Sequence, residues 1–163
     1  MRQILELLER DATLTPETLA TMIDRPVEEV RAQIAAWVRS GAIRRYRAVV
    51  DWDAVDDDPT RETVTAFIDV SITPARGVGF DDVAGRIARF DEVRSVYLVS
   101  GSQDLRCTVT GPTIRAVSDF VSQKLSTIDR VRSTATHFVL KTYKRDGDAF
   151  RTDEPDHRLP VTP

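Results

Sequence analysis

A short polar loop between two apolar runs carries residue types suited to binding a small charged ligand. It lies inside "YLVSGSQDLRCTV", residues 97–109, and holds Gly101 and Asp104 three positions apart. A glycine lets backbone N–H groups approach an anion such as a carboxylate, and Asp104 can accept a hydrogen bond from an ammonium. A second interpretation is a longer hairpin loop, in which Gly101 adopts a positive φ and Asp104 caps the turn.

Basic side chains gather in "RRYR", where Arg44, Arg45 and Arg47 surround Tyr46. The cluster belongs to "AIRRYRAVVDW", residues 42–52, whose β-branched and aromatic content predicts a short strand or hairpin. Contacts from Lys and Arg to phosphates supply most of the non-specific affinity of proteins for DNA, so this segment is a candidate to lie along a DNA backbone. The alternative is a solvated strand edge, protected by its charges from pairing with other strands.

The sequence carries no arrangement typical of catalysis, a cofactor or a metal site. "RGVGFDDVAG" places Gly77 and Gly79 before a helix but lacks a full G-x-G-x-x-G motif and a Walker lysine, so it indicates a flexible connection. His137 and His157 form no metal-ligand pattern, and no serine or cysteine lies in a nucleophile elbow. A single cysteine, Cys107, predicts a buried, inert thiol. We therefore expect no enzyme activity, no cofactor and no metal.

Composition limits the class of protein. Of the 163 residues, 41% are apolar and 30% charged, which is typical of a soluble globular protein with one ordinary domain or two small ones. No apolar run approaches the roughly 20 residues that a membrane span needs. "MRQILELLER" is an amphipathic charged segment rather than a secretory leader. We expect a cytoplasmic protein that makes no membrane contact.

The first 50 residues have helical periodicity. A first helix reaches about Arg10, and a second begins with Thr15 as its N-cap and Pro16 at its first position. A third follows the tight turn "DRP" and ends at Gly41. Its apolar residues lie on one helical face: Val27, Val30, Ile34, Trp37 and Val38. Three helices followed by a strand predict a winged helix-turn-helix domain over residues 1–50.

The rest of the chain has strand periodicity interrupted by two helices. "DWDAVDDDPTRE", residues 51–62, is acidic, contains a proline and predicts a linker. Strands are predicted over 63–72, 93–100, 105–110 and 131–144, and helices over 80–90 and 114–128. The order βαββαβ predicts a ferredoxin-like domain over residues 63–145, hence an α+β protein, with a C-terminal tail over 146–163.

Only one face of such a sheet is covered by its two helices. The other face is expected to carry Phe67 and some combination of Ala135, His137 and Val139. An apolar sheet face that nothing covers usually finds a partner, and a second copy of the chain is the simplest one. We expect a homodimer formed largely by this domain.

The winged helix-turn-helix, the linker and the βαββαβ unit with its Gly-x-x-Asp loop together resemble the Lrp/AsnC family of leucine-responsive, or feast/famine, transcriptional regulators. The resemblance extends from "ILELLERDATLTPETLA" through "GAIRRYRAVVD" to "YLVSGSQDL" and "STATHFVLKTYK". It implies that the N-terminal domain binds double-stranded DNA. It also implies dimers assembled through the C-terminal domains, often stacked into tetramers or octamers, with small amino-acid-like effectors bound between subunits.

On the basis of this resemblance, the loop is a candidate to bind the zwitterionic end of a free amino acid. The glycine and the aspartate would take the carboxylate and the ammonium, and neighbouring polar side chains would add hydrogen bonds. Two threonines of the last strand can reach in from a neighbouring subunit. The candidate effector-binding residues are Ser100, Gly101, Ser102, Gln103, Asp104, Thr134 and Thr136.

The third helix departs from the family pattern, because "AQIAAW" stands where related proteins usually carry a basic run. The helix therefore offers few phosphate contacts, although Arg31 and Gln33 can reach base edges. We expect weak DNA affinity per dimer, raised by multivalency in a larger oligomer. The candidate DNA-contacting residues are Thr15, Glu28, Arg31, Ala32, Gln33, Arg39, Arg44, Arg45, Tyr46 and Arg47.

Two other functions remain open at this point. The first is a ligand-sensing module whose helix-turn-helix is vestigial, which the acidic third helix favours. The second is an enzyme similar to the sirohaem decarboxylases, which share the two-domain architecture, although no cluster here resembles their active site. Binding of a ligand without DNA would favour the module, and binding of a tetrapyrrole would favour the enzyme.

Overall fold

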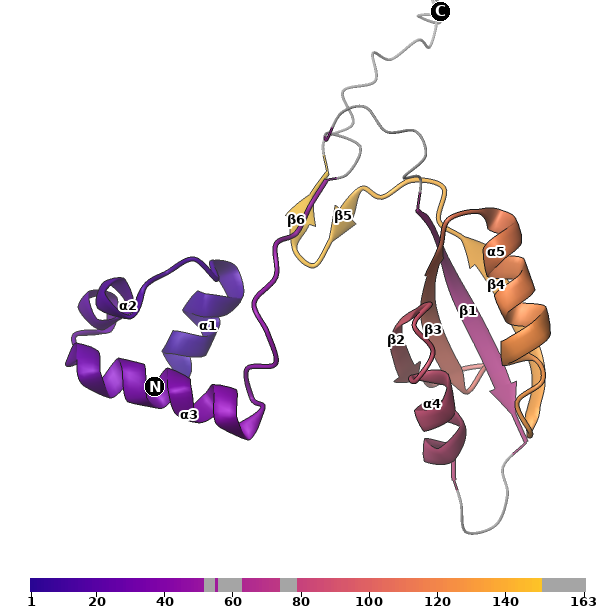
Figure 1. Ribbon diagram of the computed structural model, residues 1–163, viewed down its shortest axis with the longest axis horizontal. Coiled ribbons are helices and arrows are strands. Elements are labelled where there is room, and N and C mark those ends of the chain that lie inside the picture. Colours follow the sequence, from indigo (N-terminus) through magenta and orange to yellow (C-terminus); the bar gives the residue numbers. More distant parts are fainter. Residues whose placement is uncertain (52–54, 56–62, 74–78, 151–163) are drawn as a thin grey trace, which may run out of the picture. The chain divides into compact units, whose positions relative to one another are not determined.

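The computed structural model describes residues 1–51, 55, 63–73 and 79–150 (Figure 1). The chain divides into two compact units, Met1–Val50 and Asp51–Pro163, called unit 1 and unit 2 below. Most of the expected linker, the end of the expected tail with His157, and Gly77 lie outside the described residues.

Unit 1 consists of three helices, α1 (Arg2–Arg10), α2 (Pro16–Ile23) and α3 (Val27–Ser40). The predicted start of α2 is confirmed, because the Thr15 hydroxyl oxygen accepts the Thr18 backbone N–H at 3.2 Å. The predicted end of α3 is also confirmed, since Gly41 adopts a left-handed φ of 76°. The buried core contains Ile4, Leu8, Leu19, Ala20 and Val30.

Two predictions for unit 1 are wrong. Val38 is 50% exposed and does not join Ile34 and Trp37 against the core, because it lies at the margin of the apolar stripe in the last turn of α3. Residues 44–50 form no strand. Their composition favours extended backbone, but a strand also needs a neighbour to complete its hydrogen-bond ladder, and residues 1–51 contain no strand that could provide one.

Unit 2 contains a four-stranded antiparallel sheet in the order β2-β3-β1-β4. The strands are β1 (Val64–Ile72), β2 (Val93–Leu98), β3 (Leu105–Gly111) and β4 (Val131–Phe138). The helices are α4 (Asp81–Ile87) and α5 (Ile114–Phe120), which continues into the π-helical segment η3 (Val121–Leu125). This is the predicted βαββαβ order, so the ferredoxin-like prediction is confirmed.

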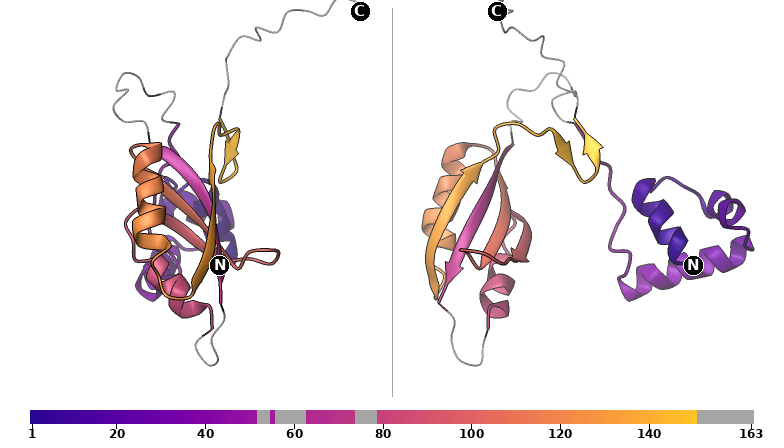
Figure 2. Two further views of the ribbon diagram at one scale, coloured as in Figure 1. Left: turned by 90° about the vertical axis from the view of Figure 1, so that its right-hand side faces the viewer. Right: turned by 180° about the vertical axis from the view of Figure 1, so that it is seen from behind.

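The two faces of this sheet differ. Both helices pack on one face (Figure 2), where Ile68 and Val70 of β1 are fully buried against Val83 and Val117. We call the opposite side the open face. It carries Phe67, which is 43% exposed and pairs across the strands with His137. Of the expected residues, Phe67, His137 and Ala135, which pairs with Asp69, therefore lie on the open face, and Val139 follows the end of β4.

The last strand is shorter than predicted. β4 ends at Phe138 rather than at residue 144, and the chain then forms a small hairpin of β5 (Lys144–Arg145) and β6 (Asp148–Ala149). Its turn places Asp146 and Gly147 at φ 53° and 100°, which is the type I′ geometry favoured by Asp-Gly. The "DG" pair was a sequence signal for this hairpin, and it lies inside the segment expected to be a tail.

Within the described ranges, none of the helices has the length and apolar character that crossing a bilayer requires.

Candidate functional site

The outer surface of α3 holds Arg31 between two carboxylates. Arg31 Nη2 donates to Glu17 Oε1 of α2, and Arg31 Nε lies 3.8 Å from Glu28 Oε1 one turn earlier in α3. Glu28, Arg31, Ala32 and Arg39 share one exposed side of α3, whereas Gln33 lies off this side and is half-buried. The charge of Arg31 is offset by Glu17, which was not expected from the sequence.

Glu17 is held in its charged form. Its own backbone N–H, the Thr15 hydroxyl and the charge of Arg31 together keep the pKa of Glu17 below its ordinary value. Thr15 also uses its hydroxyl to cap α2. The first turn of α2 is thus a small polar network that faces Arg31 of the next helix.

The segment that follows α3 presents its basic residues without a β ladder. Arg44, Arg45, Tyr46 and Arg47 are all exposed. The Arg44 guanidinium lies over Gly41, with Nη1 3.7 Å from where a Cβ of that residue would stand. A cation at this place is favourable, because the C-terminal end of a helix carries partial negative charge.

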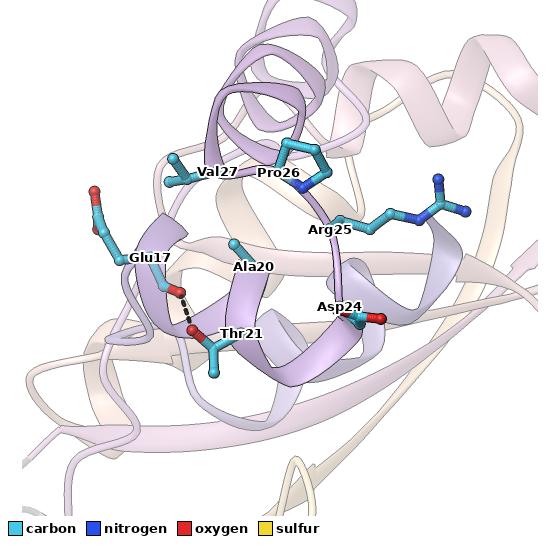
Figure 3. Close-up of a pocket in the computed structure, with 7 residues that line it drawn as sticks. All are labelled: Glu17, Ala20, Thr21, Asp24, Arg25, Pro26 and Val27. Atoms are coloured by element: carbon cyan, nitrogen blue, oxygen red, sulfur yellow. Dashed lines mark hydrogen bonds between the residues drawn. The ribbon is translucent and has the colours of Figure 1, made fainter.

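A notch of about 600 Å³ separates α2 from the start of α3 (Figure 3). Three of its polar side chains, those of Glu17, Thr21 and Arg25, already have partners within the protein. The Thr21 hydroxyl donates to the Glu17 backbone oxygen at 3.1 Å, and Arg25 pairs with Glu29 at 3.9 Å. The notch is lined by Glu17, Ala20, Thr21, Asp24, Arg25, Pro26 and Val27. We assign it to the helix-turn-helix scaffold.

A second hollow, of about 550 Å³, lies between the β2–β3 loop and the open face of the sheet. Leu98, Val99 and the expected residues 100–103 line it on the loop side. Asp69 of β1 and Arg106 of β3 line it on the sheet side, and neither was expected from the sequence. The hollow therefore brings four of the expected effector-binding residues together with an ion pair.

Asp104 has a different place from its neighbours in the loop. Its Oδ2 accepts the Ile72 backbone N–H at 2.7 Å, and its own N–H donates to the Val70 oxygen at 3.1 Å. It ties the loop to the end of β1 and does not line the hollow.

Gly101 of the same loop adopts a φ of 138°, a backbone conformation that residues with side chains rarely adopt.

The two threonines of β4 lie on the other side of the sheet. Thr134 pairs with Val70 and Thr136 with Ile68, and directly paired residues point to the same face. Both threonines therefore lie on the helix-covered side of an edge strand, away from the hollow of their own subunit.

Asp69 and Arg106 form a two-pronged ion pair across directly opposed positions of β1 and β3. The guanidinium donates from Nε to Oδ1 at 2.7 Å and from Nη2 to Oδ2 at 2.9 Å. Only 11% of the Asp69 side chain is exposed, and His137 Nε2 lies 3.7 Å from Oδ2. The hydrogen bonds from Arg106 hold the pKa of Asp69 below its ordinary value. The sequence signal was a pair of opposite charges on the open-face positions of two strands.

Cys107 is buried, as predicted. Burial, reinforced by the charge of Asp69, raises the pKa of its thiol to about 11. Among the described residues no group of three or more His, Cys, Asp and Glu side chains is arranged to hold a metal ion.

Similarity to known proteins covers nearly the whole chain. Residues 65–149 match the family model of the Lrp/AsnC ligand binding domain. The HTH-type transcriptional regulator YugG of Bacillus subtilis is 49% identical over 161 residues, covering 99% of this chain and 95% of that protein. The regulator LrpA of Mycobacterium tuberculosis is 28% identical, over 89% of this chain and 91% of its own length.

Solved structures of similar proteins superpose on this chain. The crystal structure of the M. tuberculosis leucine response regulatory protein superposes with a TM-score of 0.69 at 26% identity, over 88% of this chain and 92% of that one. A transcriptional regulator from Neisseria meningitidis, solved as an L-Met complex, superposes with a TM-score of 0.66 at 25% identity, over 87% and 88% of the two chains. A helical unit 1, an open-faced βαββαβ unit 2 and these similarities lead to one conclusion: the chain belongs to the Lrp/AsnC family of HTH-type transcriptional regulators.

Proposed function

We propose that the protein binds double-stranded DNA through unit 1 and senses a small amino-acid-like effector through unit 2. It acts as a homodimer, or as a tetramer or octamer assembled from such dimers. It works in the cytoplasm and catalyses no reaction. The observation that carries this proposal is the hollow beside the open face, which adjoins both the loop and the surface where a second subunit would pack. An effector there can favour one assembly over another, which is what allosteric control of DNA binding requires.

DNA binding is proposed for α3 and for the basic segment that follows it. Arg31 and Gln33 would contact base edges, and the exposed Arg44–Arg47 segment would contact phosphates. The remaining proposed contact residues of unit 1 are Thr15, Glu28, Ala32 and Arg39. Because Arg31 is already paired with Glu17 and lies near Glu28, each subunit has little net positive charge at this surface. Affinity would therefore depend on several subunits binding together.

Electrophoretic retardation of the DNA upstream of the protein's own gene, at two salt concentrations, tests this. We expect retardation that weakens with salt and weakens further in Arg45→Ala. Removing one arginine–phosphate interaction should flatten the plot of log K against log salt by about 0.9. Arg115→Ala is the matched control, since this exposed arginine lies on α5 of unit 2. Absence of retardation by a correctly assembled oligomer would instead favour a vestigial helix-turn-helix.

Effector binding is proposed for the hollow and its loop. Ser100, Gly101, Ser102 and Gln103 line the hollow, and Asp104 would keep the loop in register through its bond to β1. In a tetramer or octamer, Thr134 of the partner subunit and Thr136 of the partner subunit would complete the site from a neighbouring dimer, because both lie on the helix-covered side of an edge strand and not on the open face. The Neisseria regulator solved with L-Met supports an amino acid as the class of effector.

A homodimer is proposed to bury the open face. Phe67 is 43% exposed on β1, whose opposite side is buried in the core, and Tyr97 is 58% exposed and pairs with Arg106 of the open face. A charge at Phe67 should therefore disrupt pairing without harming the core. We expect Phe67→Asp to shift the protein to a smaller species in analytical ultracentrifugation. Ile114→Asp, at a position of α5 that is 58% exposed, should keep the native assembly. Native assembly of both variants would argue that the dimer forms elsewhere.

A further inference from the structure

We propose that Arg106, fixed by Asp69, and Gln103 bind the two charged ends of the effector: Arg106 its carboxylate and Gln103 its ammonium. The inference rests on the effector binding proposed above and names the residues that would hold the two charged groups of an amino acid. It places the recognition of the charged groups on a strand of the sheet and on one loop side chain.

Arg106 has the geometry of a pre-oriented anion receptor. Its Nε and Nη2 atoms both donate to Asp69, which fixes the plane of the guanidinium. Nη1 has no hydrogen-bond partner among the described residues, and the side chain is 53% exposed where it lines the hollow. A planar guanidinium held along one edge presents its other donors in a fixed direction, so a carboxylate can bind without ordering the side chain first.

Gln103 supplies the complementary acceptor. Its Oε1 atom is buried and has no hydrogen-bond partner among the described residues, which is a costly state for a polar atom. Rotation about the last side-chain torsion of glutamine is soft. Because Gln103 lines the hollow, this rotation can direct Oε1 to an ammonium of a bound ligand. Asp104 is less suited to this role, because its carboxylate accepts the Ile72 N–H.

Charge balance selects a zwitterion over a simple anion. Asp69 neutralises Arg106 and lies in the same hollow, so a ligand with only negative charge would be repelled by Asp69 as it approached Arg106. A ligand that carries an ammonium next to its carboxylate avoids this penalty. Leu98, 63% exposed, and Val99 line the rest of the hollow, and burying them favours an apolar ligand side chain.

Isothermal titration calorimetry on the full-length protein with the twenty amino acids tests the inference. The best ligand is then compared with its amide, which lacks the carboxylate charge, and its des-amino analogue, which lacks the ammonium. We expect the best ligand to have an apolar side chain and both analogues to bind at least about tenfold more weakly. Arg106→Lys keeps the charge but loses the two-pronged hold, and we expect a similar loss.

Gln103→Leu separates a binding role from a structural one. Removing a buried acceptor without a partner should leave the urea midpoint unchanged or raise it, while affinity falls about tenfold. Arg94→Lys is the matched control on the neighbouring strand, where Arg94 donates to Thr110 Oγ1; its affinity should stay within about twofold of wild type.

The outcomes distinguish the two levels of the proposal. If the wild-type protein binds none of the amino acids, effector sensing itself is wrong and the inference falls with it. If the wild type binds an amino acid but Arg106→Lys and Gln103→Leu bind it equally well, only the inference is overturned. Equal binding of the amide and the parent ligand would also overturn it.

Discussion

Two arginines of this chain are each held by a carboxylate from another element, and the two pairs differ in how much water reaches them. Arg31 of α3 meets Glu17 of α2, and both side chains are about half exposed. Arg106 of β3 meets Asp69 of β1, whose side chain is only 11% exposed. Exposed pairs gain little because water and salt screen them, whereas a carboxylate with little access to water depends on its partner.

The difference suits the two proposed roles. A side chain that contacts a base has to be open to solvent, so an exposed pair such as Arg31–Glu17, in which the Glu17 carboxylate holds only one edge of the guanidinium, is an advantage there. A side chain that orients a small ligand has to stay in place, so the two-pronged Asp69–Arg106 pair is an advantage in the hollow. Each prediction below tests whether burial separates the two pairs in this way.

The largest expected effect follows removal of Arg106. Arg106→Met leaves the Asp69 carboxylate without its main partner, and we expect thermal unfolding of unit 2 roughly 5 °C or more below wild type. Asp69→Asn leaves Arg106 free to be hydrated by water, so the loss should be about half as large. Circular dichroism melts of the full-length variants measure this asymmetry. Equal losses would show that Asp69 is better hydrated than its 11% exposure indicates.

An intermediate effect is expected from acid. The hydrogen bonds from Arg106 lower the pKa of Asp69 in the folded protein. The Asp69 carboxylate therefore contributes its full stabilisation above the pKa of aspartate in the unfolded chain, near 3.8. This stabilisation is lost as the pH falls through the lower pKa of the folded state. The stability difference between wild type and Arg106→Met should therefore be constant from pH 7 to about pH 5 and shrink below about pH 4. Urea unfolding over this range tests it, and a gap that widens in acid would contradict the assignment.

Local signals in the sequence predicted most of the fold, and tertiary contacts explain the rest. The cap at Thr15, the stop at Gly41 and the two-residue period of β1 each depend on a few neighbouring residues, and the structure has all three. The end of β4 and the missing strand at residues 44–50 depend on which partner a strand finds, which composition does not specify.

In the candidate site, too, some residues could be predicted from local sequence and others depend on tertiary contacts. Residues 100–103 were found from their types, since small polar residues around a glycine are a local pattern. Asp69 and Arg106 are 37 positions apart, and only the β1–β3 register makes them neighbours. Asp69 lies two positions after Phe67 in β1 and so shares its face, but the sequence does not specify which residue of another strand lies opposite it.

The smallest effect on stability is expected when the exposed Arg31–Glu17 pair is broken. The informative measurement for this pair is the affinity of the protein for DNA. Glu17→Gln should change the melting temperature of unit 1 by no more than about 1 °C, because exposed ion pairs contribute little. Glu6→Gln, which removes the exposed partner of Arg2 on α1, is the matched control. Glu17→Gln should raise affinity for random DNA, since it removes a negative charge from the proposed contact surface, and should do so more than the control.

Glu17→Gln should lower the sequence specificity of DNA binding even as it raises affinity for random DNA. Glu17 fixes one edge of the Arg31 guanidinium, and Nη1 of Arg31 has no hydrogen-bond partner among the described residues, so it is open to a base. We expect Glu17→Gln to weaken base preference at one position of the binding site, as Arg31→Ala does, and to have no further effect on that preference in the Arg31→Ala background. Arginine contacts to a base commonly discriminate by about 1–3 kcal/mol, so a panel of single-base substitutions in a retardation assay has enough range to detect this. Independent, additive effects of the two substitutions on base preference would mean that the exposed pair does not orient Arg31. Only the pair with the nearly buried carboxylate would then position its arginine, and Arg31 would contact bases independently of Glu17.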